Sequence, residues 1–416
     1  MTNVLFDLSP FGLARYSDSS RGGIYHYTKN LAQELARLDN ISLKFTASRY
    51  TLESHAHLCE NLLLKKAKFL RGDSPLWQLM VGLELVTNKY AKNYPLTRRL
   101  NRKFSSTILG GGFLSSEYTR QIDVFHSTFF PFPKSIIENK KVKKLITIYD
   151  LIPVKFPEFF TPNQRADHKS ILTGLDKDTW VICISNSTRD DLLQTTDSID
   201  PSKVFVTPLA PSNDARMCGE PEIVVVRKKY GIPNGRYILG VGTLEPRKNI
   251  GALLACFSRI VRDKKYTDLH LVLVGAKGWY YEDILRKIDS DRYLKDRVVL
   301  TGYVDDNELP PLFSGALFFV YPSIYEGFGI PPLEAMACGC PVITSNTSSL
   351  PEVVGDAGFM VNVNDEDELL GRMMDLLQSD DLLAAYKKKS LKQAAMFSWG
   401  GTARKTADIY LKIAQS

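Results

Sequence analysis

Short apolar runs recur along most of this chain, and a longer segment with helical patterning follows most of them. In the first half, the predicted strands are rich in Val, Ile and Phe and are bounded by turn residues; they cover residues 4–8, 41–47, 123–127, 145–149, 181–185 and 204–208. In the second half, they cover residues 237–242, 269–275, 298–303, 317–321, 342–345 and 359–363. Continuous apolar strands that alternate with helices predict an α/β fold, in which helices cover both faces of parallel sheets.

The length of the chain, 416 residues, exceeds the size at which a single hydrophobic core stops growing, so two domains are expected. Residues 211–222 form a turn-rich stretch without periodicity, which we interpret as the linker. The predicted domains therefore cover residues 1–210 and 211–396. Residues 397–416 are patterned as a helix that either caps its own domain or, as we expect, crosses back to the first.

Charge and targeting features narrow the class of protein. The net charge of +7 fits an anionic small ligand, an anionic membrane surface or nucleic acid. No nucleic-acid recognition motif accompanies the basic excess, so we do not expect nucleic acid as a partner. The sequence shows neither a secretory signal nor an apolar stretch of about 18 residues, and its six scattered cysteines are typical of reduced thiols. We therefore expect a cytoplasmic protein, at most peripheral on the inner face of the membrane.

The strongest motif is EGFGIPPLE, which starts at Glu326, ends at Glu334 and follows the apolar run ALFFVYPS. Its glycines allow a tight turn and a close backbone approach to a ligand. Pro331 and Pro332 suit the first turn of a helix, whose N–H groups can bind an anion. Glu334, about one turn inside, can accept hydrogen bonds from a diol such as a ribose. The motif lies where open parallel sheets bind ligands, although a structural turn with solvated glutamates is the alternative.

A second motif, GVGTLEPRKN, follows the first predicted strand of the second half and contains Thr243, Arg247 and Lys248. Adjacent Arg and Lys side chains at a junction between a loop and a helix suit a diphosphate, because Arg binds oxygens bidentately and Lys supplies a point charge. The alternative is a solvated basic pair. In the first half, Gly22 and Gly23 precede a predicted helix and again permit close approach to phosphate, or simply form a turn.

Two further candidates, His126 and Asp150, end predicted strands of the first half. Each is functional or simply structural, since a single His near a strand end often packs in the core and an Asp often caps a turn. No metal site is predicted. The D-x-D pairs at residues 176–178 and 289–291 lie in polar, helix-like segments without a preceding apolar strand.

Together these motifs resemble glycosyltransferase family four, which has the GT-B fold. Glu326 and Glu334 match its E-x7-E signature, and the continuation EAMACGCPVITSNTSSLPEVVGDAG is very similar to that family. The segments GTLEPRKN and ICISNSTRDDL are similar too, and the resemblance is strongest over residues 237–358. It implies two Rossmann-like domains that face each other across a cleft, with the active site between them and the nucleotide sugar held by the second domain.

The resemblance also implies roles for individual residues. Arg247 and Lys248 match the diphosphate-binding pair, Glu334 matches the glutamate that contacts the ribose, and Glu326 matches the one near the sugar hydroxyls. His126 matches the histidine near the transferred sugar, and we expect it to act in catalysis with Glu326, Arg247 and Lys248. The expected substrate-binding residues are Gly22, Gly23, Asp150, Thr243, Arg247, Lys248, Glu326, Gly327, Phe328, Gly329, Ile330 and Glu334.

The function implied is retaining transfer of a hexose from a nucleotide diphosphate sugar, without a divalent metal. Cationic side chains and helix N-termini take the place of a metal in stabilising the leaving diphosphate. We expect GDP-mannose as donor, with UDP-sugars open, and a glycan or lipid-linked glycan of bacterial surface polysaccharide as acceptor. The basic segment over residues 52–116 is expected to meet anionic lipid or a lipid-linked acceptor; a solvated basic surface is the alternative.

Other classes of protein compete with this interpretation. A nucleotide-sugar epimerase or a phosphorylase can share the architecture, and a nucleotide- or sugar-binding module without catalysis is the non-enzymatic alternative. An NAD-dependent oxidoreductase needs G-x-G-x-x-G at the start of a helix. Here Gly240 and Gly242 are present, but Glu245 stands where the third glycine is required. The basic pair and the E-x7-E run favour transfer from a nucleotide sugar.

Overall fold

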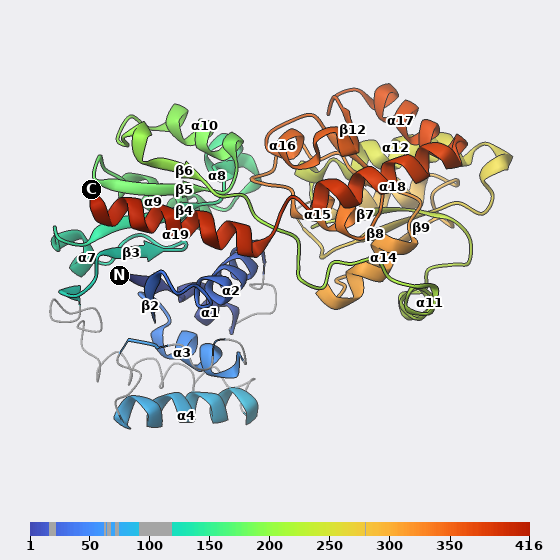
Figure 1. Cartoon of the computed structure of the whole chain (residues 1–416). Coiled ribbons are helices and arrows are strands. Elements are labelled where there is room, and N and C mark those ends of the chain that lie inside the picture. Colours follow the sequence, from blue (N-terminus) through green and yellow to red (C-terminus); the bar gives the residue numbers. More distant parts are fainter. Residues whose placement is uncertain (16–21, 62–63, 65–67, 71–74, 91–118, 279) are drawn as a thin grey trace.

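The computed structural model describes residues 1–15, 22–61, 64, 68–70, 75–90, 119–278 and 280–416. They form two lobes, each built around a six-stranded parallel sheet (Figure 1). The first sheet has the order β2 (Ile41–Thr46), β1 (Thr2–Asp7), β3 (Val124–Ser127), β4 (Lys143–Ile148), β5 (Thr179–Cys183), β6 (Val204–Val206). The second has the order β12 (Gly358–Val361), β11 (Val342–Ser345), β10 (Phe319–Tyr321), β7 (Tyr237–Val241), β8 (His270–Val274), β9 (Val298–Gly302). Each predicted strand is found, and the predicted α/β class is confirmed.

Helices pack on both sheets because strands that are apolar on both faces must be covered on both. Those of the first lobe are α1 (Ser9–Ala14), α2 (Gly23–Leu35), α3 (Thr51–Glu60), α4 (Pro75–Tyr90), α7 (Lys134–Glu138), α8 (Ile152–Lys155), α9 (Pro162–Thr173) and α10 (Asn186–Thr195). Those of the second are α11 (Glu220–Lys229), α12 (Ile250–Val261), α13 (Tyr281–Ser290), α14 (Leu309–Gly315), α15 (Ile330–Ala337), α16 (Leu350–Val354), α17 (Glu366–Gln378) and α18 (Asp380–Ala394).

The last helix, α19 (Trp399–Gln415), lies against α2, β1 and β3 of the first lobe, although the chain reaches it from the second (Figure 1). Its first turn is tied to the segment that joins the lobes. The indole nitrogen of Trp399 donates to the carbonyl of Pro211 at 2.9 Å, and Thr402 Oγ1 donates to that of Pro208 at 2.7 Å. The apolar residues predicted on this helix, such as Ala403 and Ile413, are fully buried.

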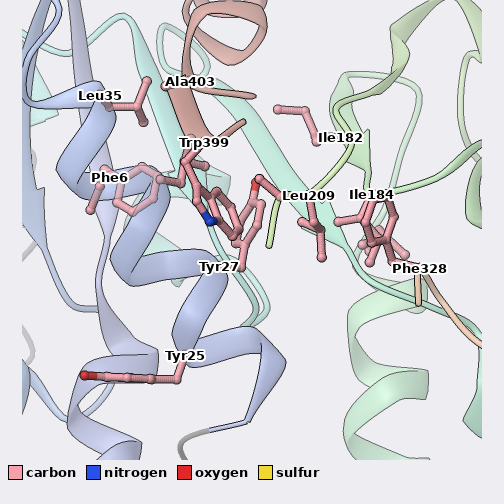
Figure 2. Close-up of a cluster of buried hydrophobic side chains, with 14 of the residues drawn as sticks. Phe6, Tyr25, Tyr27, Leu35, Ile182, Ile184, Leu209, Phe328, Trp399 and Ala403 are labelled. Carbon is pink, nitrogen blue, oxygen red and sulfur yellow. The ribbon is translucent and has the colours of Figure 1, made fainter. Parts of the chain in front are cut away.

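The hydrophobic core of the first lobe continues into the second. Figure 2 shows Tyr27 of α2 and Trp399 of α19 in one buried cluster with Leu209, near the junction of the lobes. Phe328, from the EGFG turn of the second lobe, belongs to the same cluster and is 4% exposed. Burial of such large side chains contributes about 2 kcal/mol each, so the EGFG turn is part of the packed junction and not a solvated loop.

A candidate active site in the cleft between the lobes

A cavity of about 640 Å³ lies between the two sheets, and residues of both lobes line it. The predicted site residues that line it are Gly22, Gly23, Asp150, Thr243, Arg247, Lys248, Glu326, Gly327, Phe328, Gly329, Ile330 and Glu334. They come from loops that follow strands of both sheets and from the helices that begin after these loops, which is where parallel sheets form ligand sites. Of the predicted site residues, only His126 is not among those that line the cavity.

Glu326 is the centre of a buried ionic cluster. Its Oε1 lies 2.5 Å from the ammonium nitrogen of Lys248 and 3.0 Å from a guanidinium nitrogen of Arg247. The hydroxyls of Tyr321 and Ser323 donate to the same oxygen at 2.9 and 2.5 Å. All hydrogen bonds that the described residues make to this carboxylate end on Oε1, so Oε2 is left for a ligand.

These contacts fix the charge states in the cluster. Burial raises the pKa of Glu326, but the charges of Lys248 and Arg247 outweigh it and lower that pKa to about 2. Burial lowers the pKa of Lys248, and Glu326 opposes the shift. Burial also acts to lower the pKa of Arg247, but Glu326 and Glu245 raise it above its usual value. Glu326 is therefore a carboxylate, held by cations at the bottom of the cavity.

Arg247 and Lys248 are not a solvated basic pair, because both already contact carboxylates. Arg247 also contacts Glu245, at 2.6 Å, so two cations face two carboxylates. Charged pairs that are already held in position lose little freedom when a ligand arrives. The charges of the site are therefore balanced without a ligand, and both cations are already held in position. Sequence reasoning missed Glu245, although it lies two residues before Arg247. It also missed Tyr321 and Ser323, because their hydroxyls reach Glu326 only when the chain turns after β10.

The backbone of the EGFG turn, residues 326–329, is held by serine hydroxyls on both sides. Ser349 Oγ lies 2.9 Å from the carbonyl of Glu326 and 2.8 Å from that of Phe328. Ser185, from the first lobe, donates to the carbonyl of Gly327 at 2.7 Å. Three successive carbonyls are thus satisfied by side chains, which fixes the direction of the peptide planes between them.

The N–H groups of residues 327–329 make no hydrogen bond with any described residue, and these residues line the cavity. Successive N–H groups form a concave binding site for anions or hydroxyl oxygens. The helix that follows, α15, offers fewer free N–H groups than the motif predicted. Pro331 and Pro332 have no N–H group, and the N–H of Leu333 already bonds to the carbonyl of Gly329 at 3.3 Å. The donors at this end of the cavity therefore belong mainly to the turn.

Glu334 lies on α15 with its carboxylate at the cavity. Burial raises its pKa to about 7, and a hydrogen bond from the backbone N–H of Ser212 at 3.3 Å opposes the rise only in part. Asp306 and His26 both act on this pKa, and they pair with each other across the cleft at 3.1 Å. Glu334 thus changes charge near neutral pH, in a position where a bound diol can influence it.

The glycine pair faces this region from the first lobe. Gly22 precedes α2, and a Cβ placed there would meet nothing within 4 Å. Gly23 begins the helix, and a Cβ placed there would meet only Ile330 Cδ1 at 4.0 Å. The pair therefore leaves open space at the N-terminus of α2. Arg21, which precedes the pair, lies outside the described residues.

Asp150 lies just after β4 in the cavity wall. Burial raises its pKa, and the nearby His168 of α9 acts to lower it. Its Oδ1 accepts a hydrogen bond from the N–H of Ile152 at 3.0 Å. His168 also lines the cavity. Sequence reasoning did not select His168, because it lies inside a polar helical segment and not at the end of a strand.

His126 is the one predicted site residue that the structure places away from the cavity wall. Its side chain is fully buried on β3, where Nδ1 lies 2.6 Å from the hydroxyl of Tyr410 and Nε2 lies 2.8 Å from that of Thr147. Burial lowers its pKa to about 3, so the ring is neutral. Both nitrogens are occupied by protein hydroxyls and the ring is not in the cavity wall, so His126 joins α19 to the first sheet.

Two features are absent from the part of the chain that the structure describes. Within it, no group of three or more His, Cys, Asp or Glu residues is placed to hold a metal ion. None of its helices is long and apolar enough to cross a membrane.

Solved structures of enzymes share this architecture. A sucrose-phosphate synthase from Thermosynechococcus elongatus superposes with a TM-score of 0.66, over 100% of both chains and with 19% sequence identity. WaaG, a glycosyltransferase involved in lipopolysaccharide biosynthesis, superposes with a TM-score of 0.61, over 98% of this chain and 99% of WaaG, with 15% identity. The fold is that of the GT-B class.

Sequence comparison identifies the family. The profile of "Glycosyl transferases group 1" matches residues 225–393. The chain is 33% identical to the O-antigen chain mannosyltransferase B of Escherichia coli, over 67% of this chain and 72% of that protein. It is 29% identical to the mannosyltransferase WbdA of Escherichia coli over 67% of this chain, which is 34% of the length of WbdA. The chain belongs to the group 1 glycosyl transferases and is a glycosyltransferase.

Proposed function

We propose that this glycosyltransferase moves mannose from GDP-mannose to a glycan or lipid-linked glycan acceptor in bacterial surface polysaccharide synthesis, with retention of the anomeric configuration. The observation that carries the proposal is the cluster around Glu326. Two cations and the free N–H groups of residues 327–329 lie together in one cavity, which suits a diphosphate with a sugar attached. The choice of mannose is supported by the E. coli relatives, which are mannosyltransferases by name.

In the proposed reaction, the second lobe binds the donor. Arg247 and Lys248 stabilise the charge that develops on the leaving diphosphate. The N–H groups of residues 327–329 and Oε2 of Glu326 hold hydroxyls of the sugar, and Glu334 accepts hydrogen bonds from the ribose. The bond between C1 of the sugar and the phosphate oxygen breaks as the acceptor oxygen bonds to C1 on the same face. The acceptor proton passes to a phosphate oxygen, and the reaction needs no further reactant.

The structure favours a binding role for Glu326 over a nucleophilic one. A carboxylate whose pKa is lowered to about 2, and whose Oε1 accepts from four groups, is a weak base and a weak nucleophile. Asp150 and His168 instead lie on the wall contributed by the first lobe. We assign them to the acceptor side, where they orient the attacking hydroxyl.

We also propose a peripheral contact with an anionic membrane through the first lobe. The outer face of α4 exposes Leu79, Leu83 and Val86, which are 61%, 53% and 57% exposed. Their spacing places them on one side of the helix. The segment that follows is basic, and its Lys92, Arg98, Arg99, Arg102 and Lys103 lie outside the described residues. Anionic vesicles should retain the protein at low salt and lose the variant Leu83→Gln; no retention of the wild type would end this idea.

The function is tested by thermal unfolding of the full chain with GDP, UDP or ADP in the presence of EDTA. A nucleotide at 100 times its Kd stabilises the folded state by about 2.7 kcal/mol. We expect GDP to raise the melting temperature, and Arg247→Ala to abolish the rise. Transfer from GDP-mannose to an acceptor should then yield an α-linked product, detected by NMR. A rise with UDP alone would replace the donor assignment with a UDP-sugar, and no rise with any nucleotide would favour a different function.

A further inference from the structure

The start of α10 is the point where the first lobe contacts the EGFG turn. Ser185 precedes this helix, and its hydroxyl donates to the carbonyl of Gly327 at 2.7 Å. Thr188 Oγ1 lies 3.2 Å from the same carbonyl and 3.1 Å from that of Tyr149. Ser185 and Thr188 are buried at 0% and 2% exposure. A carbonyl in the candidate site of the second lobe is therefore held by hydroxyls of the first.

Glu352 makes the reverse connection. It lies on α16 of the second lobe, and its carboxylate accepts from the backbone N–H groups of Asn186 and Ser187, both at 3.0 Å. The side-chain amide of Asn186 adds a third bond at 2.8 Å. The first N–H groups of a helix have no partner within it, and an anion there is stabilised by the helix dipole. Glu352 thus caps a helix of the opposite lobe.

The two connections form a closed circuit. Glu352 lies three residues after Ser349, the serine that holds the carbonyls of Glu326 and Phe328. The circuit runs from the EGFG turn through α16 and Glu352 to α10, and back to the turn through Ser185. Each hydroxyl or carboxylate in this circuit either makes a hydrogen bond to the opposite lobe or fixes a peptide of the turn. If the lobes separate, the carbonyl of Gly327 and the N-terminus of α10 lose their partners together.

We propose that Ser185 and Glu352 are positioning residues of the transfer reaction. They hold the N–H groups of residues 327–329 against the acceptor side of the first lobe. The inference rests on the proposed function, because it assigns the turn to the sugar. Arg247, Lys248 and Glu334 all belong to the second lobe, so nucleotide affinity should depend little on this circuit. The rate of transfer should depend on it strongly, because small misplacements of reacting groups cost large factors in rate.

The kinetic test compares Ser185→Ala, Ser185→Thr and Glu352→Ala in the full chain. We expect kcat to fall about tenfold in S185A and E352A, with the Kd for GDP unchanged. S185T keeps the hydroxyl and should regain most of kcat. The matched control is Asp190→Ala, which removes an exposed carboxylate on α10 that pairs with Arg189 of its own helix. Equal losses in D190A and E352A, or parallel losses of kcat and GDP affinity, would overturn the proposal. Glu352 is exposed, so its variant carries the test if a change at buried Ser185 prevents folding.

Hydrogen exchange separates this inference from the function on which it rests. In E352A, without any substrate, we expect faster amide exchange both at residues 186–189 and at residues 326–330, because the circuit joins them. D190A should leave the turn unchanged. If exchange rises only at α10, the circuit does not exist, whatever the donor is. If both segments respond but no nucleotide sugar is used, the circuit is present and the proposed function is wrong.

Discussion

The ammonium nitrogen of Lys248 lies 2.5 Å from Oε1 of Glu326, 78 residues further along the chain. The two residues belong to separate sequence motifs, one after β7 and one after β10, and these strands are neighbours in the second sheet. Because neighbouring parallel strands end at the same edge, their loops meet and form one ionic cluster. The basic pair and the E-x7-E motif are therefore parts of a single structure.

Breaking this pair should lower both stability and nucleotide affinity. Lys248→Met removes a charged hydrogen bond to a buried carboxylate, which costs about 2 kcal/mol in the free energy of unfolding. Urea unfolding without ligand measures it. Adding Glu326→Gln to K248M should recover part of the stability but none of the transfer activity. Lys287→Met is the control, since that ammonium is exposed and bonds to the carbonyl of Gly251. Equal stability of K248M and wild type would contradict the cluster.

Glu334 should make nucleotide binding depend on pH. Burial raises its pKa from 4.5 to about 7, and a ribose diol donates to the ionised form. GDP affinity should therefore rise by about tenfold from pH 6 to pH 8. Titration calorimetry of wild type against Glu334→Gln isolates this effect, because the ionisation of GDP is common to both. The same slope in E334Q would show that another group is responsible.

Without ligand, Glu334 should make the stability of the folded state fall as pH rises, which is the opposite of its effect on GDP affinity. Since the pKa is raised on folding, the folded protein binds more protons than the unfolded chain between about pH 4.5 and 7. The contribution of Glu334 to stability is fully present below pH 4.5 and is lost as pH rises through 7. The unfolding free energy of wild type should therefore fall relative to that of E334Q over this window.

His126 should matter for stability and not for the reaction. His126→Phe leaves the hydroxyl of Tyr410 without its partner and weakens the link between α19 and the first sheet. We expect a loss of about 2 kcal/mol in unfolding free energy, measured by thermal or urea unfolding. The kcat of the folded enzyme should be unchanged. A large fall in kcat at full folding would restore His126 to the reaction.

Gly327 should tolerate no side chain. A Cβ there would lie 2.4 Å from the carbonyl oxygen of Tyr149 and 2.9 Å from Cβ of Asp150. Gly327→Ala must therefore push the two lobes apart, and we expect kcat/KM to fall about 100-fold. Gly371→Ala on α17 is the control, because a Cβ there meets nothing within 4 Å. Similar kinetics in the two variants would mean that the lobes do not close on this turn.

The division of the chain at residues 210 and 211 stays a prediction, as do the roles of the site residues. The strands were predictable because each is a short apolar run between turn residues, and their parallel direction follows from the helices placed between them. The positions of the two main motifs were predictable for the same reason, since both follow such runs directly. His168 and Ser185 were not selected, because polar residues in and before helices have no pattern that distinguishes them from solvated ones.

What the sequence by itself determined is local: the strands, the glycine turn, the prolines after it and the kinds of residue in each motif. Only the tertiary structure decided which of them meet. It buried His126 between Tyr410 and Thr147, paired both cations with carboxylates, and raised the pKa of Glu334 to about 7. Ser185 holds a carbonyl 142 residues away. Burial, charge state and such contacts depend on distances through space, and periodicity along a chain carries no record of them.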